Sequence, residues 1–250
     1  MMKCEHLRTL LILGRVSNLP TVWSNCLAAW MLTSALSSGA RIRPLFFLLV
    51  AGCSALYLAG MVLNDAFDVA FDKLHRPERP IPSGKIDRRS VAILGFALLA
   101  GGVLLLSPLS GGWAWALAGF ILLYTAIHKK TALGLPIMAG CRALIYPLVG
   151  AAVLSGGMSR LPAMLWVASG SMALWVLVVS FLARSNSRFS AAVPNLLAGI
   201  PILDLILIGG DRLFSKACPP WNLPQSILDS LPFLGFTALA LLLRRSIPPT

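Results

Sequence analysis

Long apolar stretches recur from one end of the chain to the other, and they limit it to folds that sit in a lipid bilayer. The last stretch has only about 13 clean apolar residues, short of the roughly 17 to 25 that cross a bilayer. It is predicted either to lie at the interface or to extend back toward Trp221. From the lengths of the stretches we predict eight transmembrane helices, at residues 10–36, 44–63, 91–107, 111–127, 133–154, 161–182, 193–209 and 231–243.

The composition agrees with this interpretation. The chain is 57% hydrophobic and 12% charged, and its mean hydropathy of +0.81 lies outside the usual range of soluble domains. Short polar segments join the apolar stretches without a change in composition, so residues 1–250 are predicted to form a single integral-membrane domain. Gly14 and Arg15 interrupt the apolar run near the N-terminus, and no cleavage site follows, so we expect no removable signal peptide.

The predicted topology explains where the basic residues behind the net charge of +12 are placed. If the N-terminus is cytoplasmic, fifteen of the 21 basic residues fall in inside segments, five in outside segments, and Arg142 within a span. Because no basic soluble domain carries the charge, nucleic acid is excluded as a partner. The sequence therefore predicts an all-α, multi-pass transmembrane bundle of about eight to nine helices, and no pattern fixes an oligomeric state.

Three of the nine acidic residues fall within eight positions at the end of the second predicted span. Asp65, Asp68 and Asp72 have the spacing i, i+3 and i+7, which places three carboxylates on one stripe of a helix. Such a stripe needs a cation or abundant water to offset the repulsion. Hard oxygen ligands suit Mg²⁺, and Asn64 adds a neutral oxygen. We predict that the aspartates bind Mg²⁺ and act with Asn64 in catalysis; the alternative is a solvated turn.

The segment that follows, KLHRPERPIPSGK, is a loop stiffened by prolines. It carries Arg76, Arg79 and Lys85, and it is suited to fold back over an anion that the metal holds. Carboxylates for magnesium and basic groups for phosphate in one cytoplasmic loop predict a diphosphate site.

N-D-x-x-D-x-x-x-D followed by R-P-x-P-S-G resembles the first signature of the UbiA superfamily of intramembrane prenyltransferases. GRVSNLPTVWSN, LYTAIHKK and MAGCRALIY are similar in particular to the UbiA-like group that includes the EboC proteins, and the resemblance covers residues 14–184. It implies a bundle around a central cavity in the cytoplasmic membrane of a bacterium. It also implies that a Mg²⁺-bound isoprenyl diphosphate, held at the cytoplasmic rim, gives its isoprenyl group to an aromatic or other lipophilic acceptor.

Several polar residues lie within predicted spans. Asn18, Thr21 and Asn25 share one face of the first helix, where they line a cavity and bind substrate or form hydrogen bonds between helices. Arg142 is costly to bury unless it is paired or faces a polar cavity. Asp204 is a possible partner for it, and both a structural pair and a substrate contact stay open.

Tyr124, His128 and Lys129 lie at the cytoplasmic end of the fourth predicted span. Basic residues at this place are expected simply to anchor the topology. The resemblance instead implies that these side chains reach the diphosphate or the acceptor.

The resemblance fails at the second aspartate-rich motif, which the superfamily carries after its sixth span. The corresponding segment here, FLARSNSRFSAAVPN, contains no acid. Arg184 and Arg188, one helical turn apart, are predicted to bind the diphosphate directly in place of the second metal site. The alternative is an active site that has decayed.

Two other functions are considered. A non-catalytic carrier or binding subunit for a lipophilic metabolite is favoured by the missing second motif. A CDP-alcohol phosphotransferase also sets aspartates on membrane helices, but its signature needs a D-G pair, which the chain lacks. It ranks last.

Overall fold

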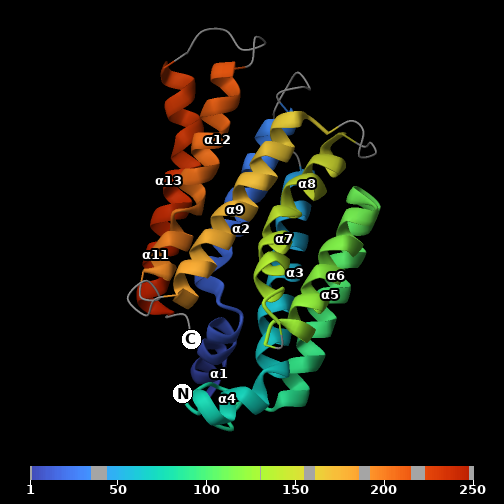
Figure 1. The fold of residues 1–250 in the computed structure, drawn as a ribbon, viewed down its shortest axis with the longest axis vertical. Helices are drawn as coiled ribbons and strands as arrows, with labels where there is room; N and C mark the ends of the chain where they lie inside the picture. The colour runs from blue at the N-terminus through green and yellow to red at the C-terminus, as the bar shows by residue number, and fades with distance from the viewer. Residues whose placement is uncertain are drawn as a thin grey trace.

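The computed structural model describes residues 2–34, 44–129, 131–154, 161–185, 192–214 and 223–247. Within these ranges the chain is helical and has no strand, which confirms the predicted all-α class. The long helices run along the long axis of the molecule (Figure 1). The first helix, α1 (Met2–Leu13), lies at the same end as the C-terminal end of the last helix, α13 (Leu223–Ser246). This end also carries the loop that follows the acidic stripe.

The first predicted span, 10–36, is wrong as one continuous helix. It consists of α1 (Met2–Leu13), a 3₁₀ turn η1 (Val16–Asn18) and α2 (Leu19–Ser34). The break begins where Arg15 takes a left-handed conformation with φ 45° and ψ 47°, which an α-helix cannot contain. Pro20 then fits the first turn of α2, where its missing N–H is not needed.

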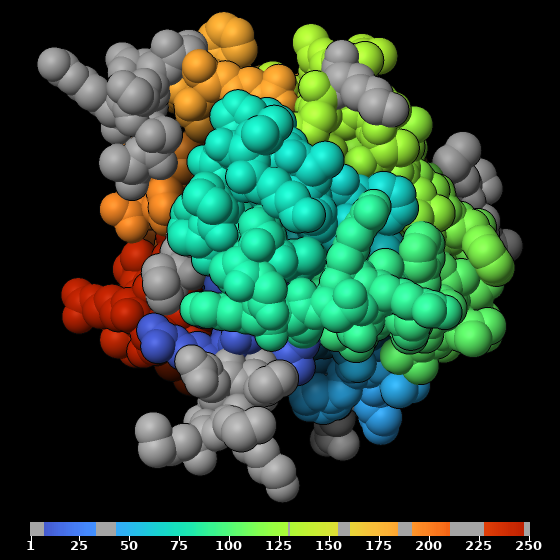
Figure 2. Space-filling model, turned by 90° about the horizontal axis from the view of Figure 1, so that it is seen from below, coloured from blue at the N-terminus to red at the C-terminus, as the bar shows by residue number. Residues whose placement is uncertain are grey.

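The acidic stripe is held by the packing of α3 (Pro44–Phe67) against α5 (Arg88–Ser110). Glycines let the two helices approach closely: a Cβ on Gly95 would lie 2.7 Å from the Leu63 side chain, and one on Gly52 would lie 2.5 Å from Leu106. The short helix α4 (Val69–His75) continues from α3. Figure 2 shows that the segment around α4 and the start of α5 covers the middle of this end of the bundle.

Five described segments are long and apolar enough to cross a membrane, so the chain is a multi-pass integral membrane protein. The last helix is longer than the predicted 231–243; its 24 residues span about 36 Å at about 1.5 Å per residue. The remaining helices are α6 (Gly112–Ile127), α7 (Gly134–Ala143), α8 (Ile145–Leu154), α9 (Ala163–Ser185), α11 (Val193–Ala198), α12 (Ile200–Phe214) and α13 (Leu223–Ser246).

The predicted span 133–154 is also divided, at Leu144 between α7 and α8. Pro147 has no N–H, so it cannot donate to the carbonyl of Ala143 four residues earlier. The Ser169 hydroxyl, on α9, donates to this carbonyl instead at 2.9 Å. A side chain from a neighbouring helix thus satisfies the backbone group that the proline leaves free.

Replacing Ser169 with alanine should destabilise the protein by about 1–3 kcal/mol, because the buried Ala143 carbonyl would lose its donor. Unfolding of the purified protein in mixed detergent would measure the change. Ser171→Ala, a half-buried serine on the same helix, is the control and should have a smaller effect. Equal effects of the two substitutions would contradict the role given to Ser169.

Candidate functional site

The three aspartates lie where α3 passes into α4, and all are buried. Their exposed fractions are 3% for Asp65, 6% for Asp68 and 1% for Asp72. Helical hydrogen bonds of 2.9 Å, from Asp68 N to Asn64 O and from Asp72 N to Asp68 O, continue across the junction at Asp68. The carboxylates therefore share a stripe, as the spacing predicts, and they are not the solvated turn of the alternative.

Two arginines neutralise the outer members of the stripe. Arg79 lies in the loop after α4, and its Nη1 is 2.7 Å from Asp72 Oδ2 and 3.4 Å from Asp65 Oδ1. Arg15 approaches from the break before α2, with Nη2 at 3.5 Å from Asp65 Oδ1. Because Arg79 is itself only 4% exposed, its charge is screened little by water.

The loop folds back over the stripe, as its prolines and basic residues predict. Ile81 packs into a small buried cluster that includes Leu13 and Val62, which anchors the loop to α1 and α3. The loop turns at Gly84, where φ of +77° favours a glycine. This anchoring brings Arg79 to the carboxylates.

The middle aspartate faces basic groups at the end of α6. His128 Nε2 lies 3.0 Å and Lys129 Nζ 3.6 Å from Asp68 Oδ2. The other ring nitrogen of His128 lies 3.0 Å from the Tyr124 carbonyl oxygen, so the ring is held between this carbonyl and Asp68. The Tyr124 ring stacks on His128 with centroids 4.8 Å apart.

Burial raises the pKa of Asp68, but the hydrogen bond and charge of His128 and the charge of Lys129 outweigh it. The pKa of Asp68 therefore lies below its usual value, and the group is ionised at neutral pH. Its contribution to stability is present above the ordinary carboxyl pKa, and it is lost as the pH falls through the lowered pKa.

Three buried oxygens of the stripe have no hydrogen-bond partner: Asn64 Oδ1, Asp65 Oδ2 and Asp72 Oδ1. Hard oxygens without partners are a donor set that fits Mg²⁺. In the described ranges, however, no three acidic, histidine or cysteine side chains form a ready metal cluster. Arg79 contacts both Asp65 and Asp72, so the guanidinium takes the place of a bound cation.

Three other basic residues that the sequence predicts to bind substrate form no ion pair with the aspartates. Arg76 and Lys85 are exposed on the loop, and Arg184 is exposed near the end of α9. None of the three forms an ion pair with a residue that the structure describes. Arg188 lies outside the described residues. A role for these four in substrate binding stays a prediction.

Arg15 is a site residue that the motif analysis missed. Its left-handed backbone points the side chain toward Asp65, and its carbonyl oxygen accepts a hydrogen bond of 3.4 Å from the Tyr57 hydroxyl. A non-glycine residue in this conformation is uncommon and marks functional sites. The signal in the sequence was the pair Gly14 and Arg15, which interrupts an apolar run.

A second polar network lies deeper in the bundle. Asp204, on α12, accepts hydrogen bonds from Ser24, from Asn25 at 2.9 Å and from Tyr146. Asn25 Oδ1 in turn accepts from Arg142 Nη1 at 3.1 Å. The direct ion pair between Arg142 and Asp204 that the sequence left possible does not form. Asn25 lies between the two charged groups and makes a hydrogen bond to each.

The polar face predicted on the first helix points inward, with Asn18 at the end of η1 and with Thr21 and Asn25 on α2. Arg142 Nη2 donates to Thr21 Oγ1 at 2.8 Å, and Arg244 Nη2, from α13, donates to Asn18 Oδ1 at 2.9 Å. Asn18, Thr21 and Asn25 thus make hydrogen bonds between helices, one of the two roles left open by the sequence.

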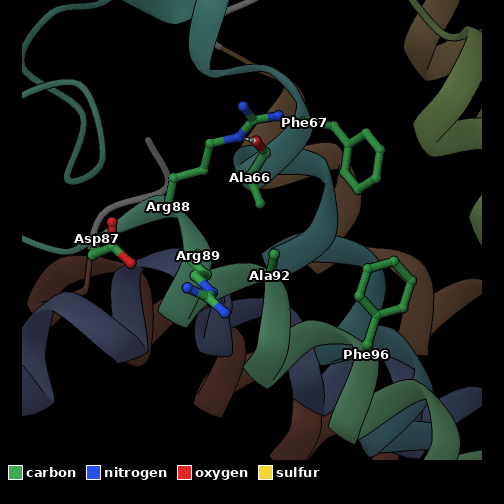
Figure 3. Close-up of a pocket in the computed structure, with 7 residues that line it drawn as sticks. All are labelled: Ala66, Phe67, Asp87, Arg88, Arg89, Ala92 and Phe96. Atoms are coloured by element: carbon green, nitrogen blue, oxygen red, sulfur yellow. Dashed lines mark hydrogen bonds between the residues drawn. The ribbon is translucent and has the colours of Figure 1, made fainter.

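A pocket opens between the end of α3 and the start of α5 (Figure 3). Arg88 Nε donates to the Ala66 carbonyl there at 2.9 Å, and the rings of Phe67 and Phe96 are exposed. The pocket therefore lies outside the aspartate cluster, and it is not the predicted central cavity. It is lined by Ala66, Phe67, Asp87, Arg88, Arg89, Ala92 and Phe96.

The sequence model of the UbiA prenyltransferase family matches residues 19–203. The digeranylgeranylglyceryl phosphate synthase of Ignicoccus hospitalis is 43% identical over 89 residues, 34% of this chain and 29% of that protein. The synthase of Methanothrix thermoacetophila is 36% identical over 146 residues, 56% of this chain and 52% of that protein. The synthase of Methanopyrus kandleri is 24% identical over 216 residues, 84% and 75% of the two chains.

The alignments with the first relatives cover 29% to 52% of those proteins' full lengths, so this chain matches only part of each. A solved structure, described as giving insights into digeranylgeranylglyceryl phosphate synthase in membranes, matches with a TM-score of 0.61 at 23% identity. The match covers 96% of this chain and 88% of that one. At this identity the likeness shows the fold, and it confirms the predicted type of bundle.

Replacing Arg79 with glutamine should destabilise the protein by about 3–5 kcal/mol, because two buried carboxylates lose their shared cation. Millimolar Mg²⁺ should restore more of the loss in this variant than it adds to the wild type, measured as the melting temperature. Arg76→Gln, an exposed arginine of the same loop, is the control. A variant as stable as the control would show that Arg79 does not neutralise the stripe.

Proposed function

Since the chain belongs to the UbiA prenyltransferase family, we propose that it transfers an isoprenyl group from an isoprenyl diphosphate to an aromatic or other lipophilic acceptor in the membrane. The observation that supports this most is the buried aspartate stripe with its unpartnered oxygens, surrounded by four basic side chains. A high local density of both carboxylates and basic side chains is typical of a site that binds a metal ion together with a polyanion.

In the proposed complex the carboxylates and the basic groups exchange partners. Mg²⁺ held by Asp65, Asp68, Asp72 and Asn64 would supply positive charge to the diphosphate when bound. Arg79, released from the carboxylates, turns to the phosphate oxygens and forms charge-assisted hydrogen bonds with them. The remaining basic groups that take part are Arg15, His128 and Lys129.

The transfer needs no covalent intermediate with the protein. The bond between the first isoprenyl carbon and the diphosphate oxygen breaks, and both electrons leave on the oxygen. Basic side chains placed around the leaving group stabilise this charge. The acceptor forms the new bond to the allylic carbon, and its proton passes to the released pyrophosphate. Apolar helix faces keep water from the isoprenyl cation that this step produces. The Tyr124 ring stacks on His128 beside the site, and the face of an aromatic ring attracts positive charge.

We further propose that the site faces the cytoplasm, in the cytoplasmic membrane of a bacterium. The distribution of basic residues supports this orientation, because the loop after α4, the C-terminal end of α6 and the C-terminal end of α13 lie at the end of the bundle that also carries α1 (Figure 1). These segments carry Arg79, Lys129 and Arg244.

A binding subunit for a lipophilic metabolite is the second candidate. The segment 181–195 contains no acid, so a second set of metal ligands is missing from the sequence there. Such a protein would hold an isoprenyl diphosphate without turnover.

The test is an assay of purified protein in lipid vesicles with farnesyl or geranylgeranyl diphosphate, mixed acceptors and Mg²⁺, following release of pyrophosphate and prenylated product. Asp68→Ala should lower the rate by about 10² or more, because the leaving group loses its stabilisation. Asp87→Asn, an exposed aspartate of the next helix cap, should keep it.

Full activity of the Asp68→Ala variant would contradict the proposed site. Tight binding of the diphosphate without pyrophosphate release, across the whole acceptor panel, would favour the binding subunit.

A further inference from the structure

The pocket between α3 and α5 joins a charged region of the surface to an apolar one. Arg89, Ala92 and Phe96 have the spacing i, i+3 and i+7, so they share one face of α5. The small Ala92 side chain between two long ones leaves a hollow, which Phe67 lines from the end of α3 (Figure 3). The volume of the pocket, about 450 Å³, lies within the range of small-molecule sites.

The charged part of the pocket has more positive than negative charge. Arg88 and Arg89 line it together with one carboxylate, Asp87. Asp87 Oδ2 caps α5, because it accepts hydrogen bonds from the Ser90 backbone N–H at 3.0 Å and the Ser90 hydroxyl at 3.3 Å. Among the described residues neither arginine forms an ion pair. Two arginines against one aspartate therefore leave an excess of one positive charge.

One of the two arginines is held in place by the backbone of α3. Arg88 Nε donates to the Ala66 carbonyl oxygen at 2.9 Å, and its two terminal nitrogens have no hydrogen-bond partner among the described residues. The planar fork of a guanidinium matches two oxygens of a phosphate. Because the Arg88 side chain is already ordered, it loses less conformational freedom when it binds an anion.

The pocket lies where the membrane interface is expected. α5 is one of the five segments that are long and apolar enough to cross a membrane, and Arg88 is its first residue. Phe96 follows eight positions later, about 12 Å along the helix axis at about 1.5 Å per residue. The polar layer on each side of a bilayer is only about 5–7 Å thick. The pocket thus reaches from the level of the headgroups into the hydrocarbon.

The apolar part of the pocket is continuous with the surface that faces lipid. Phe67 is 50% and Phe96 47% exposed, and Ile93, beside the pocket on α5, is 61% exposed. On a membrane-spanning helix such side chains contact acyl chains. A soluble phosphate compound would leave both rings uncovered, whereas an amphiphile covers the rings and pairs with the arginines.

We propose that this pocket binds an anionic phospholipid of the surrounding bilayer, with its phosphate on Arg88 and Arg89 and an acyl chain against Phe67 and Phe96. Basic pockets between transmembrane helices bind the headgroups of anionic lipids. Zwitterionic lipids with the same chains bind more weakly, because their ammonium group opposes the arginines. This binding goes beyond the proposed transfer and does not depend on it, since the pocket lies outside the aspartate cluster.

The experiment compares two lipids that have the same chains and differ in headgroup charge, dioleoyl phosphatidylglycerol and dioleoyl phosphatidylcholine. The full chain in neutral detergent is titrated with each lipid, and native mass spectrometry counts the bound lipids and gives the Kd of the first. Glycerol 3-phosphate, which has the phosphate without the chains, is titrated in parallel. The melting temperature is followed for all three ligands.

Phosphatidylglycerol should bind the wild type about tenfold or more tightly than phosphatidylcholine, and it should raise the melting temperature, whereas glycerol 3-phosphate should not. Arg89→Gln should weaken phosphatidylglycerol binding about fivefold, and the double variant with Arg88→Gln should weaken it further. Arg245→Gln removes the same charge from an exposed position at the same end of the bundle, so it is the matched control and should bind like the wild type (Figure 1).

A second variant tests the pocket without changing any charge. Ala92→Phe fills the hollow and should weaken phosphatidylglycerol binding about as much as Arg89→Gln does. Ala100→Phe, at an exposed alanine farther along α5, is its control and should have no effect. Arg88 makes a structural hydrogen bond, so the double variant can fail to fold. Arg89→Gln and Ala92→Phe then decide the question, since both positions are free of such a bond.

Three results would overturn the proposal. Equal Kd values for the two lipids would show that the site does not select an anionic headgroup. Equal losses in Arg89→Gln and Arg245→Gln, or wild-type binding by Ala92→Phe, would show a general attraction of a cationic protein for anionic lipid. Stabilisation by glycerol 3-phosphate as large as that by phosphatidylglycerol would assign the arginines to a soluble phosphate compound. None of these titrations requires turnover, so absence of prenyl transfer leaves the lipid site standing.

Discussion

The end of the bundle that carries α1 and α4 depends on one interaction, the neutralisation of buried carboxylates by basic side chains. Like charges at the end of a membrane helix repel strongly where water is scarce. The partners of Asp65, Asp68 and Asp72 come from three places: the break before α2, the loop after α4 and the end of α6. The same contacts that make the stripe tolerable therefore also join these segments and close the end of the bundle.

Two charged systems of different balance lie in the bundle, an outer one at the junction of α3 and α4 and an inner one beside α2. The outer one has as many carboxylates as arginine and lysine partners, so it can exchange internal ion pairs for a metal and a polyanion at little change in net charge. The inner one, around Arg142 and Arg244, has more positive than negative charge and unused donors.

The parts of the structure that local spacing determines could be predicted from the sequence. Apolar length predicts the membrane bundle, and the positions of Asp65, Asp68 and Asp72 fix their common helix face. Contacts that depend on how distant helices pack could not be predicted. Arg244 meets a residue 226 positions away, from a helix whose apolar stretch is the weakest, and Asn25 was not foreseen as the bridge between two buried charges.

The conformation of Arg15 ties a local backbone strain to the charge balance of the stripe. A left-handed backbone at a residue with a Cβ costs about 1–2 kcal/mol, and glycine adopts it freely. Glycine at this position would relieve that strain, but it would also take away one of the two arginines that neutralise the buried Asp65. Position 15 therefore cannot be redesigned as an ordinary strained turn, because the residue that its backbone favours is not the residue that the neighbouring carboxylate needs.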